Sequence, residues 1–346
     1  MITSRKSKSI GLFSGGLDSL LATKLVTEQG VQAVALHFRL PFLSPARPTK
    51  EDKLRSLAEL VGASFVPVDV GDDYLMAVKT PQHGYARNMA PCIDCIVYML
   101  GKAKELAREI SADFLFTGEV VGQRSHCQNK RSLKLIEKVA GIDGRLLRPL
   151  SAKLLEPTVP ELTGLLRRER LLDIKGRGRR RQIRLAHEFG IIDYAAPTGG
   201  CLLTDQNYAS KVRDAIDNQQ LDMQDIGLLQ LGRHFRLDSG AKVVVGRNER
   251  ENRRLEQLVV DGDLVCRPKE VMGPMVILRG RELADSDPET AARICARYSD
   301  SAEDREVLVA CSGGDVRVKP VSAEELEKWR VRPQVEEEEE KEEDES

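Results

Sequence analysis

The sequence predicts an α/β protein with a doubly wound parallel sheet, followed by a second, smaller α+β domain. Up to Leu150, short apolar runs rich in β-forming residues alternate with segments of helical periodicity, a pattern typical of parallel βαβ units. Within Gly227–Leu278 the strand candidates are instead short and separated by Gly and Asp turns. A chain of 346 residues is long enough for two such domains, each with its own core.

The strands of the first domain are indicated by short apolar runs. In chain order they are Ile10–Phe13, Val31–Phe38, Ser64–Val70, Asp113–Thr117 and Arg145–Leu150. Helices between them are indicated by apolar residues three or four positions apart, such as those within Glu51–Val61. A further helical stripe, interpreted as core, consists of Ile96, Met99, Leu100, Ala103, Leu106 and Ala107.

The second domain is predicted from a run of short strands and one capped helix. The strand candidates are Lys242–Val245, Leu264–Cys266, Met275–Leu278, Val307–Ala310 and Val316–Val318. Ser322–Trp329 is predicted to be a helix, because Ser322 and Glu325 form the capping-box pattern that marks the start of a helix. The predicted boundaries are residues 1–215 for the first domain, 216–330 for the second and 331–346 for a disordered tail.

Composition excludes several classes of protein. The net charge of −1 conceals the segment Glu336–Ser346, in which nine acidic residues and one lysine predict a solvated tail. No apolar run is long enough to span a membrane, and the first residues lack the apolar region of a signal peptide, so a cytoplasmic location is expected. In such a chain, seven cysteines indicate thiol chemistry or metal ligands and not a disulfide framework.

A glycine-rich turn lies between the first strand and the first helix, with the sequence Ser14-Gly15-Gly16-Leu17-Asp18-Ser19. Two glycines let the backbone approach a ligand closely, and the helix that follows directs free N–H groups and its positive dipole end toward an anion. Ser14 and Ser19 add hydroxyl groups. The turn lacks the Gly-Lys-Ser/Thr ending of kinases and GTPases. A structural turn that only closes the sheet is the alternative.

This turn resembles the pyrophosphate loop of the PP-loop ATP pyrophosphatase superfamily, whose fold is the adenine nucleotide α-hydrolase-like sheet. The resemblance implies an enzyme that splits ATP between the α and β phosphates, adenylates a carbonyl oxygen and releases pyrophosphate. Asp18 would act on the phosphates through Mg²⁺, a cation suited to carboxylate and phosphate oxygens. By the same analogy, His37 and Phe38 would flank the adenine.

Three cysteines are the second group of candidate functional residues, after the glycine-rich turn. Cys92 and Cys95 make a C-x-x-C motif after Pro91, and Cys201 ends the segment Pro197-Thr198-Gly199-Gly200-Cys201. Buried apolar thiols or a redox dithiol would explain C-x-x-C alone. A structural zinc site needs a fourth ligand, which neither turn supplies. Three thiolates with an open position suit a catalytic metal or an iron–sulfur cluster.

The cysteine pattern is similar to that of tRNA 2-thiouridine and 4-thiouridine synthetases. In that family three cysteines hold a [4Fe–4S] cluster, and the open iron carries sulfide. Residues 116–128 also resemble the Gly-Glu-x-x-Gly-Gln stretch of 4-thiouridine synthases, which adds Thr117, Gly118 and Gln123 to the implied ATP site. Cys127 stands where those enzymes usually have serine, and it is therefore not expected to be catalytic.

RNA contacts are predicted in two places. Arg167–Arg184 contains nine Arg or Lys residues against two acids, which favours phosphate binding over a merely solvated helix face. The basic turns at 232–236 and 245–252 resemble the small RNA-binding domain of ribosome quality-control proteins, although a packing or dimerisation domain is the alternative. The residues selected as RNA-binding are Arg177, Arg179, Arg180, Arg181, Arg233 and Arg247.

The combined hypothesis is an ATP-dependent tRNA sulfurtransferase that adenylates a uridine carbonyl oxygen and replaces it with sulfur. Cys92, Cys95 and Cys201 are its expected metal ligands and, with Asp18, its catalytic residues. The sulfur comes from a cluster in one version and from a cysteine persulfide in the other, and in both a separate sulfur donor is required. A homodimer is a further expectation. The rival hypotheses are a PP-loop enzyme that acts on a small molecule and a non-enzymatic RNA-binding factor.

Overall fold

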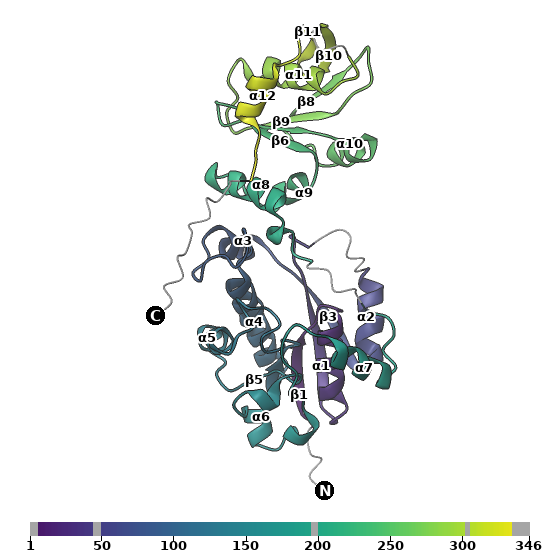
Figure 1. Cartoon of the computed structure of the whole chain (residues 1–346), viewed down its shortest axis with the longest axis vertical. Helices are drawn as coiled ribbons and strands as arrows, with labels where there is room; N and C mark the ends of the chain where they lie inside the picture. Colours follow the sequence, from purple (N-terminus) through teal and green to yellow (C-terminus); the bar gives the residue numbers. More distant parts are fainter. Residues whose placement is uncertain (1–5, 44–49, 195–199, 302–304, 334–346) are drawn as a thin grey trace, which may run out of the picture. The chain divides into compact units, whose positions relative to one another are not determined.

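The computed structural model describes residues 6–43, 50–194, 200–301 and 305–333. The chain divides into two compact units, Met1–Thr204 and Asp205–Ser346 (Figure 1). The sequence-predicted boundary at 215 lies inside helix α8 (Gln206–Asp217), which belongs wholly to the second unit. A boundary cannot interrupt a helix whose buried face packs within one unit. Most of the predicted tail lies outside the described residues.

The first unit contains the predicted parallel sheet, with strand order β3-β2-β1-β4-β5. All neighbouring strands pair in parallel. The chain therefore winds first to one side of β1 and then to the other, which places a topological switch point between β1 and β4. The strands are β1 (Lys8–Leu12), β2 (Gln32–Arg39), β3 (Ala63–Asp69), β4 (Phe114–Phe116) and β5 (Leu146–Leu147).

Seven α-helices are described in the first unit. They are α1 (Leu17–Thr27), α2 (Glu51–Leu60), α3 (Asp72–Lys79), α4 (Cys92–Glu109), α5 (Lys130–Ala140), α6 (Val159–Leu162) and α7 (Arg180–Glu188). Helix α1 is buried on most of its surface, since it packs between the sheet and α7. Of the apolar stripe on α4, only Leu100 and Ala103 are buried. The interpretation as core is wrong for Ile96 and Met99, which are half-buried and line a cavity, and Leu106 and Ala107 are also only half-buried.

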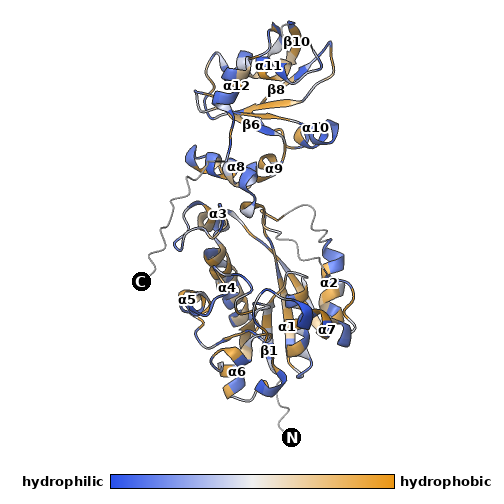
Figure 2. Ribbon diagram, in the orientation of Figure 1, coloured by the Kyte–Doolittle hydropathy of each residue, from blue (hydrophilic) through white to orange (hydrophobic). Residues whose placement is uncertain are grey.

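The second unit is an α+β domain with an antiparallel sheet in the order β11-β10-β8-β9-β7-β6. Helix α11 packs on this sheet and completes its main core. Figure 2 shows hydrophobic residues along the strands and polar residues on α10. The elements are α8, α9 (Asp225–Leu229), β6 (Arg233–Arg236), β7 (Lys242–Val245), α10 (Glu249–Glu256), β8 (Leu264–Pro268), β9 (Val276–Arg279), α11 (Asp287–Arg297), β10 (Val307–Cys311), β11 (Gly314–Val318) and α12 (Ala323–Trp329).

The second unit contains a capped helix that the sequence predicts and a disulfide that it does not. The capping box at the start of α12 is present, with Ser322 and Glu325 each bonded to the other's backbone N–H. Cys266 and Cys311 form a disulfide with a Cα–Cα distance of 4.2 Å, which was not predicted from the sequence, while the other five cysteines are free. The two residues face each other across β8 and β10. Strand register over such a long separation leaves no local signal in the sequence.

A buried ionic cluster joins α8 to the sheet of the second unit. Asp214 on α8 lies 2.6 Å from Arg236 Nη2 on β6 and 3.2 Å from Lys242 Nζ on β7. Lys242 is only 4% exposed, and its burial lowers the pKa of this amine to about 8. Although burial would raise the pKa of Asp214, the hydrogen bond from Arg236 and the charge of Lys242 hold it below its ordinary value. The carboxylate therefore compensates two otherwise buried cations.

No α-helix in the described part of the chain is both long and apolar enough to cross a membrane.

Candidate functional site

The glycine-rich turn adopts the geometry of an anion site. Gly15 has a φ of +70°, a left-handed conformation that favours glycine, and a Cβ there would approach a Leu54 methyl carbon to 2.3 Å. Ser19 Oγ donates to the Gly16 carbonyl at 2.8 Å, which folds the turn onto the first residues of α1. Gly16 occupies the N-cap without a side-chain hydrogen bond. The first amides of α1 are thus available to a phosphate.

Asp18 is held at the start of α1 by two polar neighbours. Its Oδ2 accepts a hydrogen bond from Gln123 Nε2 at 3.0 Å and lies 3.5 Å from Arg179 Nη2. Its Oδ1 is buried and has no hydrogen-bond partner among the described residues. Gly118 permits this arrangement, because a Cβ at that position would lie 2.6 Å from the backbone carbon of Asp18. An unpaired carboxylate oxygen beside a phosphate-type loop is a suitable ligand for Mg²⁺.

One cavity of about 330 Å³ lies at the carboxyl ends of the first unit's strands. It is lined by all of the residues predicted to bind ATP except Gly15, whose role in the turn is conformational. Those lining residues are Ser14, Gly16, Asp18, Ser19, His37, Phe38, Thr117, Gly118 and Gln123. The His37 ring is oriented by Nδ1, which lies 2.8 Å from the Phe13 carbonyl oxygen. The cavity lies where open parallel sheets bind their ligands.

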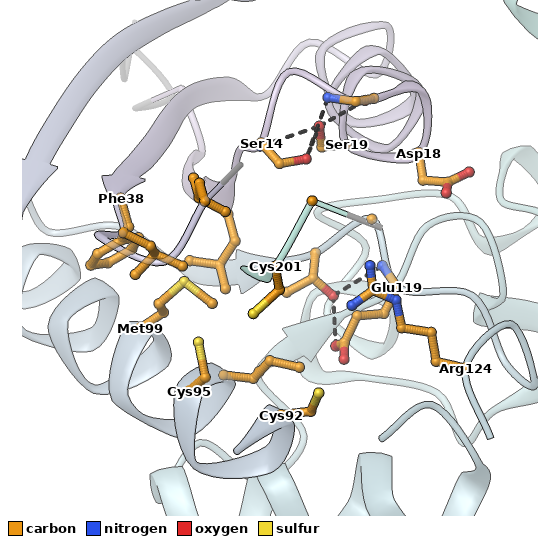
Figure 3. Close-up of a pocket in the computed structure, with 18 of the residues that line it drawn as sticks. Ser14, Asp18, Ser19, Phe38, Cys92, Cys95, Met99, Glu119, Arg124 and Cys201 are labelled. Atoms are coloured by element: carbon orange, nitrogen blue, oxygen red, sulfur yellow. Dashed lines mark hydrogen bonds between the residues drawn. The ribbon is translucent and has the colours of Figure 1, made fainter. Parts of the chain in front are cut away.

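The three predicted cysteines line this same cavity (Figure 3). Cys92 and Cys95 stand on the first turn of α4, where a spacing of three places them on one face. Cys201 is held by an isolated bridge to Leu43, and the next amide donates to the Phe42 carbonyl at 2.8 Å. Folding therefore brings together thiols that are about a hundred residues apart in sequence.

A single metal ion has no ready-made site here. Within the described ranges, no three His, Cys, Asp or Glu side chains are close enough together to hold one ion. A [4Fe–4S] cluster makes a different demand, because each cysteine binds its own iron and the ligands stand around the cluster and not around one point. Three cysteines around one cavity are compatible with that ligand type.

The cavity thiols differ in acidity. A hydrogen bond from Cys127, aided by the positive charge of Arg124, lowers the pKa of Cys92 to about 7. Burial raises the pKa of Cys95 to about 12, although the Tyr74 hydroxyl lies 3.4 Å from its sulfur. Burial also raises the pKa of Cys201. Cys92 is thus the cavity thiol with the greatest thiolate character at neutral pH.

Cys127, Arg124 and Glu119 were not selected as site residues from the sequence, yet the structure places all three at this site. Cys127 is buried and shares its hydrogen bond with Cys92, which raises the pKa of Cys127. Arg124 and Glu119 line the cavity. The available signal was their position in the Gly-Glu-x-x-Gly-Gln stretch that also contributes Gln123.

In metal-free protein, we expect iodoacetamide to alkylate Cys92 before Cys95. At about pH 7 roughly half of Cys92 is thiolate, whereas Cys95 stays protonated, and the thiolate is the reactive form. Peptide mass spectrometry at a series of pH values measures both rates. The Cys127→Ala variant is expected to move the Cys92 midpoint upward, toward the ordinary thiol value of about 8.5. Equal rates for the two cysteines across the series would contradict this difference.

The predicted RNA-binding arginines are placed in different environments. Arg177 and Arg180 are exposed around the start of α7, whereas Arg179 points to Asp18 and Arg181 Nη2 lies 2.7 Å from Asp173. The second unit holds the other two. Arg233 lies over the Tyr298 ring at 4.7 Å, and Arg247 Nη2 lies 2.6 Å from Glu251 Oε1.

Two protein-family models match the chain. Residues 4–153 match the model described as thiamine biosynthesis protein (ThiI), and residues 232–330 match the NFACT protein RNA binding domain. The first match covers β1 to β5 and therefore contains the glycine-rich turn, Cys92 and Cys95. The second covers the sheet of the second unit.

Curated relatives are similar to part of the chain. A tRNA-specific 2-thiouridylase MnmA of Nitratidesulfovibrio vulgaris is 34% identical over 125 residues, which are 33% of this chain and 35% of that protein. A probable tRNA sulfurtransferase of Finegoldia magna is 30% identical over 142 residues, 41% of this chain and 35% of that protein. The chain thus spans about a third of the length of these relatives.

Solved structures give weak overall matches. A 4-thiouridine synthetase in complex with RNA and ATP has a TM-score of 0.37 at 21% identity, over 65% of this chain and 52% of that one. The C-terminal part of a fibronectin/fibrinogen-binding protein from Streptococcus suis has a TM-score of 0.27 at 13% identity, over 69% and 90%. The family models therefore carry the comparison: residues 4–153 are similar to the ThiI family, and residues 232–330 are similar to the NFACT RNA-binding family.

Proposed function

We propose that this chain is an ATP-dependent tRNA sulfurtransferase that thiolates a uridine. The observation that carries the proposal is the single cavity lined by both the phosphate-type turn and the three cysteines. Activation by ATP and delivery of sulfur must occur at the same carbon atom, so one cavity has to serve both. The match of the second unit to an RNA-binding family supports RNA as the substrate class.

The protein would hold ATP at both its phosphate end and its adenine end. Its phosphates would receive hydrogen bonds from the turn at Ser14–Ser19 and from the first amides of α1. Arg179, which lines the cavity, would compensate their negative charge. The adenine would lie near His37 and Phe38 at the end of β2. Mg²⁺, held on the unpaired Oδ1 of Asp18, would stabilise the charge that develops on the phosphates.

The reaction would proceed by adenylation and substitution. The uridine carbonyl oxygen attacks the α-phosphorus of ATP, and pyrophosphate leaves. A sulfur nucleophile then adds to the activated ring carbon, and AMP departs with the former carbonyl oxygen. Substitution is feasible because AMP is a far better leaving group than the oxide ion of an unactivated carbonyl.

The sulfur would be delivered through the cysteines. Cys92, Cys95 and Cys201 would hold the [4Fe–4S] cluster, which when bound would offer one open iron position for sulfide. In the persulfide alternative, the low pKa of Cys92 makes it the thiol best able to accept sulfane sulfur, with a second cavity cysteine to resolve it. The three cysteines that line the cavity favour the cluster version, because three protein ligands would leave one iron position open.

The RNA backbone would be bound electrostatically. Arg177 and Arg180 are exposed and could contact RNA phosphates directly. Arg181 would first have to leave its ion pair with Asp173. Arg233 and Arg247 on the second unit remain candidates, although each already contacts a neighbour in its own unit. The homodimer and the cytoplasmic location stay predictions from the sequence.

The test is tRNA-dependent formation of AMP and pyrophosphate under anaerobic conditions, with sulfide as the sulfur source. We expect turnover with bulk tRNA, and a loss of at least about a hundredfold in kcat for Asp18→Asn, since a ligand for transition-state charge is removed. The matched control is Asp52→Asn on the exposed side of α2, which should leave kcat unchanged. Thiolated nucleoside in digested tRNA gives the second readout.

Two outcomes would favour the rival functions. AMP formation that is independent of tRNA, with no retention of tRNA at low salt, would indicate a small-molecule substrate. Salt-sensitive tRNA binding without any AMP formation would indicate a non-enzymatic RNA-binding factor.

A further inference from the structure

Glu119 lines the cavity and carries a buried carboxylate oxygen without a hydrogen-bond partner among the described residues. The residue follows β4 and is 7% exposed. Its Oε2 accepts hydrogen bonds from Thr117 Oγ1 at 2.9 Å and from Arg148 Nε at 3.1 Å. Its Oε1 has no partner among the residues that the structure describes. A buried acceptor in this state is costly unless a ligand supplies a donor.

The position of Glu119 is fixed by its surroundings. Arg148 is 2% exposed and is itself held by Glu137 on α5 and by the Leu133 carbonyl oxygen. Because Arg148 is anchored in this way, its hydrogen bond holds the Glu119 carboxylate by Oε2 and leaves Oε1 without a partner among the described residues. Glu119 lines the same cavity as the three cysteines (Figure 3). A second side chain of that cavity, Gln128, also has a buried Oε1 without a partner in the described part of the chain.

These unpaired acceptors call for a ligand that carries an N–H donor near the cysteines. The uracil ring has one such group, N3–H, which lies between both ring carbonyl carbons, so the same contact serves thiolation at either carbon. Cytosine has an acceptor at N3 and would be repelled by a carboxylate oxygen. Recognition through a required hydrogen bond of this kind discriminates strongly, because the wrong base leaves the buried group unpaired.

We propose that Glu119 binds the N3–H of the target uracil and removes its proton during adenylation. The inference rests on the proposed function. As the proton passes from N3 to Glu119 Oε1, the N–H electron pair forms a C=N bond to the activated carbon, the carbonyl oxygen attacks the α-phosphorus, and pyrophosphate leaves. When sulfur adds and AMP departs, the proton returns to N3. Glu119 is thus a catalytic residue that acts as a general base.

The test compares two isosteric Glu→Gln variants, one at Glu119 in the cavity and one at an exposed glutamate of the first unit. In Glu119→Gln the amide oxygen must stay on Thr117 and Arg148, which both donate, so the amide nitrogen takes the place of Oε1 and presents a donor to N3–H. We expect tRNA-dependent AMP formation to fall at least about a hundredfold in kcat, as for loss of a general base. The matched control is Glu109→Gln at the exposed end of α4, which has no part in the cavity and should stay within about threefold of wild type.

Two further measurements separate catalysis from structure. ATP affinity should be unchanged in both variants. A tRNA with N3-methyluridine at the position that the wild type thiolates should be inert with the wild-type enzyme, because no N3 proton is available. If Glu119→Gln matched Glu109→Gln while the wild type was active, this inference would fail and the proposed function would stand. Recovery of Glu119→Gln activity at high Mg²⁺ would overturn it in favour of a cation ligand, and an inactive wild type would refute the function itself.

Discussion

Replacement of Cys201 by alanine is expected to abolish tRNA thiolation while tRNA-dependent AMP formation continues. Cys201 lines the cavity but has no contact with the glycine-rich turn among the hydrogen bonds described, so adenylation does not depend on it. Thiolation should fall by at least about a thousandfold, the effect of removing an essential group of a catalytic unit. AMP is measured by chromatography, and thiolated uridine by mass spectrometry of the digested tRNA.

Iron and sulfide analysis of the same variant separates the two sulfur mechanisms. Under the cluster version, anaerobically prepared Cys201→Ala loses most of its iron, because only two of three ligands remain. Under the persulfide version, the wild type contains little iron from the start. Cys295→Ala is the control, since Cys295 is a free cysteine in the core of the second unit. Unchanged iron in Cys201→Ala would refute the three-ligand site, and retained thiolation would refute any role of this cysteine.

Asp214→Asn is expected to destabilise the second unit by about 3 kcal/mol, the range for breaking a buried ion pair from one side. The substitution removes the paired carboxylate from Lys242, which is buried, and from Arg236, which is largely buried. Trp329 on α12 is the only tryptophan of the chain, so its fluorescence during urea unfolding reports on this unit alone.

The Asp214 carboxylate also predicts a pH effect on the stability of the second unit. Because the folded-state pKa of Asp214 is depressed, its stabilisation is present at neutral pH and disappears as the pH falls through that pKa.

Asp217→Asn is the matched control for this prediction. Asp217 stands on the same helix, is exposed, and should change the unfolding free energy by no more than about 0.5 kcal/mol. Equal urea midpoints for the two variants would show that the cluster at Asp214 does not stabilise the unit.

Features that depend on neighbouring residues were predictable from the sequence. The five parallel strands follow from short apolar runs, and the start of α12 follows from the spacing of Ser322 and Glu325. Side chains at a boundary between core and cavity were harder to predict. Ile96 and Met99 satisfy the periodicity of a buried helix face, but periodicity does not distinguish a protein core from the wall of a cavity.

The residues of the candidate site also fall into two groups, those that local sequence predicts and those that only the tertiary structure shows. The turn at Ser14–Ser19 and the C-x-x-C motif are local patterns, so residue type and spacing were enough to select them. The contact of Cys127 with Cys92 and the unpaired oxygen of Glu119 emerge only from the folded chain. Whether a buried polar atom is satisfied depends on partners such as Arg148, which folding brings from distant parts of the sequence, and no local pattern records that pairing.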